Sequence, residues 1–106
     1  MPLKITEADI EAYQNDGAVL IKNLLNNQEV SDLREGIEAN ISNPSLNSKI
    51  ASNKNDPGWF LEDFCNWQKN PSYQRIIFES SVPEVASKLM RSKQVRLYHD
   101  HMLVKK

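Results

Sequence analysis

The sequence contains one cysteine, no excess of charge of either sign and no long apolar run, and each absence excludes a class of protein. Cys65 cannot form an internal disulfide and belongs to no Cys-x-x-Cys motif, so we expect a reducing compartment, the cytoplasm. We interpret its thiol as a packed small side chain, with a nucleophilic role as the alternative.

Charge and hydropathy narrow the choice of partners. The net charge is -1, which argues against a nucleic acid or an anionic membrane surface as the main partner. The N-terminus lacks the apolar core of a signal peptide, and nowhere does the sequence predict a membrane-spanning segment.

The residues that are present indicate a small globular unit. Hydrophobic residues make up 40% of the chain and charged residues 25%, which is typical of a folded domain and not of a disordered one. We predict a single unit over residues 1–106 with an α+β fold in which helices dominate.

Helix signals mark four segments of the chain: 5–17, 27–41, 72–79 and 82–92. In the first, Thr6 can cap the N-terminus with Asp9 at the third helical position, and Gly17 supplies the stop. Asn70 followed by Pro71 is a good start for the third helix. The fourth helix is predicted to begin with a capping box formed by Ser81 and Glu84, and to turn Val85 and Leu89, with Met90 as filler, toward the core.

Two segments read as strands, 18–22 and about 94–105, and we predict that they lie side by side with the helices on one face. Between the helices, residues 42–58 are rich in Ser, Asn, Lys and Pro and predict a long surface loop. Four aromatic residues follow it, which we interpret as core anchors for the loop, with a substrate-facing wall as the alternative: Trp59, Phe60, Phe64 and Trp67.

The final strand carries the polar residues of greatest interest. Because side chains alternate along a strand, His99, His101 and Lys105 share one face and Asp100 points to the other. A mononuclear metal site needs a third ligand, and none follows from the spacing, so a metal at the two histidines competes with histidines that line a cavity or serve structure alone. Lys105 is either a solvated lysine or a point charge that binds an acid.

The order of these features resembles the N-terminal part of the phytanoyl-CoA dioxygenase family, whose members are oxygenases dependent on Fe(II) and 2-oxoglutarate. The resemblance rests on four segments, in chain order ITEADIEAYQNDGAVLIKNLL, EVSDLREGIEA, FCNWQKNPSYQRIIFESSVPEVASKLMRSKQVRLYHD and HMLVKK. It covers nearly the whole chain except the Ser/Asn loop.

The resemblance implies a helical lead-in followed by the first strands of a double-stranded β-helix, a jelly roll that is incomplete in this chain. It implies that Lys105 binds 2-oxoglutarate, and that the iron ligands, a His-x-Asp and a distant His, lie beyond residue 106. No catalytic residue and no metal ligand is therefore assigned within the chain. Fe(II), 2-oxoglutarate and a small-molecule substrate belong to the full-length parent, and we expect the chain to be inactive alone.

Two further expectations follow. The alternative function is a stand-alone α+β binding or interaction module without catalysis. In either case the strand at 94–105 carries apolar side chains on both faces, so we expect the chain to self-associate through this strand.

Overall fold

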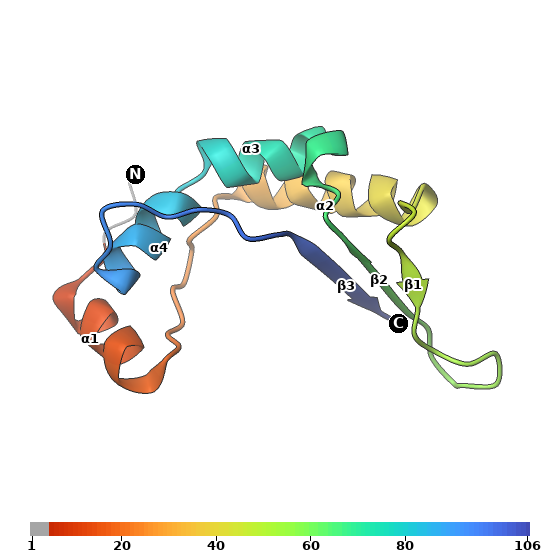
Figure 1. Ribbon diagram of the computed structural model, residues 1–106, viewed down its shortest axis with the longest axis horizontal. Coiled ribbons are helices and arrows are strands. Elements are labelled where there is room, and N and C mark those ends of the chain that lie inside the picture. Colours follow the sequence, from red (N-terminus) through yellow and green to blue (C-terminus); the bar gives the residue numbers. More distant parts are fainter. Residues whose placement is uncertain (1–4) are drawn as a thin grey trace.

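The computed structural model describes residues 5–106, which form an elongated body (Figure 1). Its α+β class is the predicted one. In chain order the elements are α1 (Glu7–Asp16), α2 (Asn27–Ser42), β1 (Lys49–Ile50), β2 (Phe60–Phe64), the short 3-10 helix η1 (Trp67–Lys69), α3 (Pro71–Glu79), α4 (Val82–Met90) and β3 (His101–Lys105). The radius of gyration is 15.9 Å, above the roughly 13 Å expected of a compact domain of this length. The body is therefore extended, and its core is thin.

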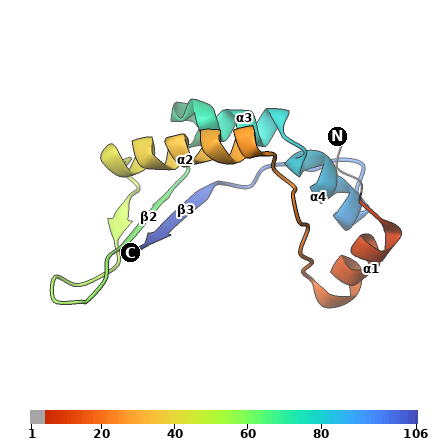
Figure 2. The same cartoon turned by 180° about the vertical axis from the view of Figure 1, so that it is seen from behind.

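The sheet is antiparallel with strand order β1-β2-β3, so β2 is central and β3 is an edge strand. Leu61, Asp63 and Met102 are buried on one face of the sheet. Helices α2 and α3 lie side by side across this face, as both views of the ribbon show (Figures 1 and 2). Helices α1 and α4 pack against each other at the far end of the body.

The ends of α1 and the start of α3 are set by capping groups close to them in the sequence. Thr6 and Asp9 form the predicted capping box, with Asp9 N–H donating to Thr6 Oγ1 at 3.2 Å and Thr6 N–H donating to Asp9 Oδ2 at 3.1 Å. Gly17 ends α1 with a φ of 76°, a left-handed conformation that glycine adopts without strain. Asn70 caps α3 through Tyr73 N–H, and Pro71 occupies the first turn. These predictions are confirmed.

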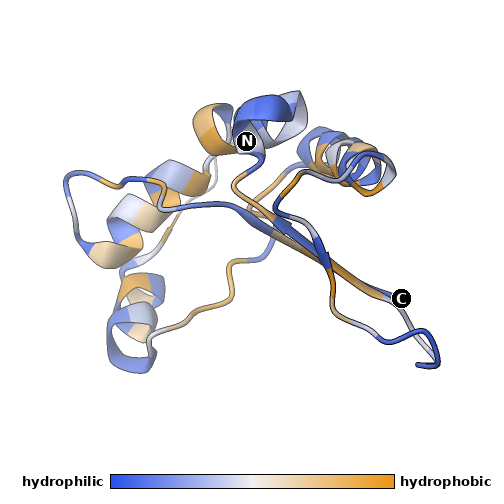
Figure 3. Ribbon diagram, turned by 45° about the vertical axis from the view of Figure 1, so that its right-hand side comes forward, coloured by the Kyte–Doolittle hydropathy of each residue, from blue (hydrophilic) through white to orange (hydrophobic). Residues whose placement is uncertain are grey.

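The predicted strand at 18–22 is wrong. Residues 18–22 form no strand; they belong to an apolar linker between α1 and α2 in which Leu20 is 77% exposed and Asn23 has a φ of 60° (Figure 3). A β-strand needs a neighbouring strand to pair with its backbone N–H and C=O groups. β3 pairs with β2 and not with residues 18–22. The final strand is also shorter than predicted, since regular pairing begins at His101 and not near Gln94.

Three smaller expectations are corrected. Ser81 precedes α4 but makes no side-chain capping bond, because its backbone is already helical at φ -75° and ψ -7°. Val85 is buried as predicted, whereas Met90 is 51% exposed. Cys65 is exposed, not packed, because a φ of 56° turns the chain outward between β2 and η1.

The aromatic residues do not form one core cluster. Trp67 packs edge-on against Phe78 with ring centroids 5.4 Å apart, Phe64 lies against the ring of His101, and Trp59 lies under the Lys106 ammonium at 5.8 Å. All the aromatic residues predicted as anchors are half-buried. They bridge elements at the surface of the body and do not fill its interior.

Candidate functional site

The face of the sheet opposite α2 and α3, which we call the open face, carries the residues that the sequence singled out. It consists of alternate residues from β2 and β3: Phe60, Glu62, Phe64, His101, Leu103 and Lys105. The three residues from β3 are exposed and the three from β2 are half-buried. The alternation predicted for this part of the final strand is confirmed, since Met102 between them is buried on the other face.

Lys105 lies at one end of the open face, paired across the strands with Phe60. Next to it, Trp59 and Lys106 exchange two backbone hydrogen bonds of 2.8 Å each, which close the sheet at this end. A shallow hollow of about 250 Å³ runs from Lys105 to Ser52 in the preceding loop. Within residues 5–106 no carboxylate lies within ion-pair distance of the Lys105 ammonium, so its charge is available to a ligand.

The two histidines come together at the other end of the open face. Their ring centroids are 6.2 Å apart, and both rings lie near Phe64, at 6.5 Å for His99 and 5.5 Å for His101. Asp100 points away from them, as predicted, and its carboxylate accepts hydrogen bonds from the backbone N–H groups of Asn66 and Trp67. Asp100 therefore holds the start of η1.

Fe(II) does not fit the residues described. A facial iron site needs two imidazoles and a carboxylate on one side of the metal. No group of three His, Cys, Asp or Glu side chains is placed to hold a metal anywhere in residues 5–106. The carboxylate nearest in sequence to the histidines, Asp100, is committed to η1 on the opposite face.

The covered face of the sheet contains a buried polar network that no sequence pattern predicted. The Asp63 side chain is fully buried and accepts hydrogen bonds from Asn40 Nδ2 at 2.8 Å, Ser45 N–H at 2.8 Å and Phe64 N–H at 2.9 Å, and a further bond from the Ser45 hydroxyl. Asn40 in turn accepts a hydrogen bond of 2.8 Å from the Tyr73 hydroxyl. Through these hydrogen bonds the network connects four parts of the chain: α2, the loop after α2, β2 and α3. The sequence contains one sign of this network: Asp63 is a charged residue that strand alternation places on the same face as Leu61.

The network shifts the pKa of two of its members. Burial by itself would raise the pKa of Asp63, but the hydrogen bonds from Ser45 and Asn40 outweigh it and hold that pKa below its usual value. Burial raises the pKa of Tyr73 to about 12, and the negative charges of Asp100 and Asp63 add to the effect. At neutral pH the network therefore consists of an ionised carboxylate and a neutral phenol.

Comparisons of the chain with known protein families, with curated proteins and with solved structures found no match. None of the described helices is long and apolar enough to cross a membrane. The resemblance to the phytanoyl-CoA dioxygenase family therefore stays a prediction that rests on the sequence.

Proposed function

We propose that this chain forms the N-terminal part of an oxygenase of the phytanoyl-CoA dioxygenase family, which uses Fe(II) and 2-oxoglutarate to hydroxylate a small molecule. In this proposal the helices are the lead-in, and β1–β3 are the first strands of a double-stranded β-helix. The supporting observation is that Lys105, His99 and His101 lie toward the exposed side of a sheet whose other side is covered by helices. A jelly roll that encloses a ligand needs such a strand face for its interior.

The role proposed for Lys105 is to bind a carboxylate of 2-oxoglutarate. A lysine ammonium acts as a compact point charge, and the ammonium of Lys105 has no ion-pair partner among the described residues, although Asp56 also lines the hollow. Ser52 lies in the same hollow and can add a hydroxyl donor. The iron ligands would come from other residues of the full-length protein.

The direct test is 2-oxoglutarate binding to the purified chain, followed by NMR titration. We expect weak binding that perturbs the amides of 103–106 and weakens about tenfold in Lys105→Gln, since a hydrogen bond to a charged group is worth roughly 1.5–3 kcal/mol. The matched control is Lys93→Gln, an exposed lysine outside the hollow. Binding that is equal in both variants would refute the role of Lys105.

The alternative is a stand-alone binding module. The gene sequence that follows Lys106 discriminates between the two, because the oxygenase requires a His-x-Asp and a later His there. Their absence would favour the module, in which the open face and its histidines would contact a partner directly.

We also propose that the chain self-associates through β3. Trp59 and Lys106 are a hydrogen-bonded pair, and pairs alternate along an antiparallel ladder, so the N–H and C=O groups of His101, Leu103 and Lys105 point to the free edge of the sheet. A second copy placed antiparallel on this edge would satisfy them, with the two Leu103 side chains opposite each other.

A further inference from the structure

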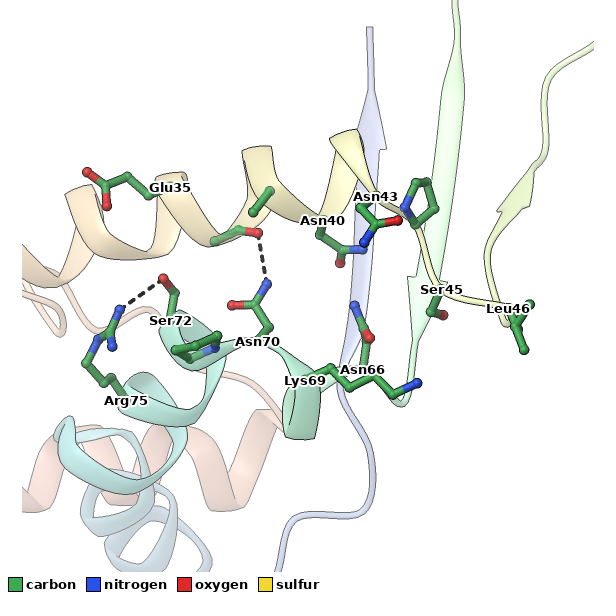
Figure 4. A pocket seen from close by; sticks show the side chains of 14 residues that line it. Glu35, Asn40, Asn43, Ser45, Leu46, Asn66, Lys69, Asn70, Ser72 and Arg75 are labelled. Carbon is green, nitrogen blue, oxygen red and sulfur yellow. Dashed lines mark hydrogen bonds between the residues drawn. The ribbon is translucent and has the colours of Figure 1, made fainter.

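A polar groove runs between the C-terminal half of α2 and the segment formed by η1 and the start of α3 (Figure 4). Its volume is about 490 Å³, within the range of small-ligand sites. Seven of its lining residues carry amide, hydroxyl or ammonium groups: Asn40, Asn43, Ser45, Asn66, Lys69, Asn70 and Ser72. The groove lies on the covered side of the molecule, apart from the open face and Lys105.

The walls of the groove are held rigidly. A Cβ added at Gly36 would lie 2.5 Å from the Ser72 Cβ, so α2 and α3 are already in the closest contact that their backbones allow. Asn70 bridges them, donating to Gly36 O at 2.9 Å and accepting from Tyr73 N–H at 3.1 Å. At the inner end, Asn40 is fixed by two bonds of the buried network. The groove therefore does not need to form when a ligand arrives.

Asn66 is the residue whose side chain is unexplained by the fold. It is only 8% exposed, and its backbone N–H donates to Asp100. Its side-chain amide, however, makes no hydrogen bond to any residue in the described range 5–106, whereas those of Asn40 and Asn70 are bonded on both atoms. Figure 4 shows the Asn66 amide extending into the groove toward Asn43 on the opposite wall. No buried side-chain nitrogen or oxygen of the described residues lacks a partner, so the Asn66 amide atoms are open to the groove, where a ligand can bond them in place of water.

The charged side chains that line the groove indicate the sign of the charge that a ligand should carry. Arg75 lines the far end, but two of its nitrogens, Nε and Nη2, are bonded to Asp32, at 2.7 and 2.6 Å, so its charge is neutralised. Glu35 also lies toward that end, while Lys69 extends along the near end below Asn66 (Figure 4). Lys69 has no ion-pair partner in the described part of the chain. The near end therefore combines one free positive charge with amides that donate and accept.

We propose that this groove binds a small polyhydroxylated carboxylate of the sugar-acid class. A side-chain amide presents a donor and an acceptor side by side, which matches the adjacent hydroxyl groups of a polyol. Lys69 provides the counter-charge for the single carboxylate. In this arrangement Asn43 and Asn66 bind the hydroxyl groups from opposite walls, and Lys69 orients the acid end toward η1.

The experiment is an NMR titration of the chain with gluconate, with glucose as the neutral probe and acetate as the charged probe without hydroxyls. Gluconate is expected to saturate in the millimolar range and to shift the side-chain NH2 signals of Asn43 and Asn66. Glucose and acetate should each bind about tenfold more weakly, because glucose lacks the carboxylate and acetate lacks the hydroxyl groups. No saturation by gluconate, or equal binding of all three probes, overturns the proposal.

Variants separate a ligand role from a structural one. Asn66→Leu should weaken gluconate binding about tenfold while leaving the melting temperature unchanged or higher, because it removes an amide that no described residue satisfies. Lys69→Gln should weaken gluconate but leave glucose unaffected. The matched controls Asn53→Ala and Lys54→Gln change exposed residues of the loop and should bind normally. A fall in melting temperature of Asn66→Leu with gluconate binding intact would mean that Asn66 is structural.

Lys105→Gln completes the set. It alters the open face and should leave gluconate binding unchanged, so failure of this proposal and failure of the 2-oxoglutarate proposal are distinguished. Gluconate binding that is lost in Lys105→Gln would place the ligand outside the groove and contradict the assignment.

Discussion

The two ends of the molecule are held together by different kinds of contact. At the sheet end, Asp63 and Asn40 are buried and bonded on nearly every polar atom. At the α1–α4 end, the polar links among the described residues are an exposed ion pair between Arg91 and Glu7 at 3.0 Å and one exposed hydrogen bond from Gln14 to the carbonyl of residue 89 at 2.8 Å. Buried polar bonds are expensive to break, whereas exposed ones are readily replaced by water.

This difference determines where binding sites can exist. The groove and the open face both border the sheet end, where the positions of side chains are fixed by the buried network. Within residues 5–106, the α1–α4 end has one buried apolar residue, Val85, and leaves Leu20 and Met90 exposed nearby in sequence. Its helices can shift without a large free-energy cost, so it is a poor place to hold a ligand and we expect it to open first.

The largest expected effect is from Asp63→Ala. The change leaves the donors of Asn40, Ser45 and Phe64 without an acceptor in a buried site, and we expect the free energy of unfolding to fall by about 3–4 kcal/mol. Urea titration followed by circular dichroism measures it. Glu62→Ala, the neighbouring acid on the open face, is the control, and a loss of similar size there would remove the distinction between the two faces.

Gly36→Ala tests the contact between α2 and α3. The added methyl group overlaps Ser72, and overpacking of this kind costs about 1–3 kcal/mol, partly offset by the better helix propensity of alanine. We expect a net loss of about 1–2 kcal/mol and rescue by the double variant with Ser72→Gly. A stabilised Gly36→Ala chain would mean that the helices move apart without cost.

The raised pKa of Tyr73 predicts that the stability of the fold decreases at alkaline pH. Its pKa is raised to about 12 in the folded chain, above the value of about 10 in an unfolded one. The unfolded state therefore ionises first, so stability is fully present below pH 10 and is lost as the pH rises from about 10 to about 12. Tyr73→Phe should lose roughly 1 kcal/mol at pH 7 and flatten this alkaline slope, which melting curves across the pH range would show.

Leu103→Lys tests the free edge of β3. Because the two Leu103 side chains would lie opposite each other in the dimer, lysines there should repel and leave a monomer, while the stability of each chain changes by less than about 0.5 kcal/mol. Light scattering across a dilution series is the measurement. Leu20→Lys is the matched control, since Leu20 is also exposed but lies in the linker. A wild-type chain that is monomeric at high concentration would contradict self-association.

The smallest expected effect is from Arg91→Gln. The ion pair that it removes is more than half exposed at both side chains, so the free energy of unfolding should change by less than about 0.5 kcal/mol. Hydrogen exchange should be faster in α1 while the sheet end is unaffected. A loss comparable to that of Asp63→Ala would mean that the two ends unfold as one unit held together by surface charge.

The features predicted correctly are those set by nearby residues. The capping box of Thr6 and Asp9, the left-handed stop at Gly17 and the Asn70 cap are all formed by groups within four positions of each other. The shared face of His101 and Lys105 follows likewise from the two-residue period of a strand. Each needs only the local backbone conformation, which the sequence specifies directly.

The sheet and the groove depended on the tertiary structure. Residues 18–22 are as apolar as a strand but pair with no strand among the described residues. Residues 60–64 were predicted only as part of an aromatic segment, yet they form β2 with Asp63 buried. The partners of Asp63 are 18 and 23 residues away in the chain, at Ser45 and Asn40. Local patterns cannot report hydrogen bonds between residues that only packing brings together. Both ends of α1 and the start of α3 were therefore determined by the sequence, whereas strand pairing and the polar groove were determined by the fold.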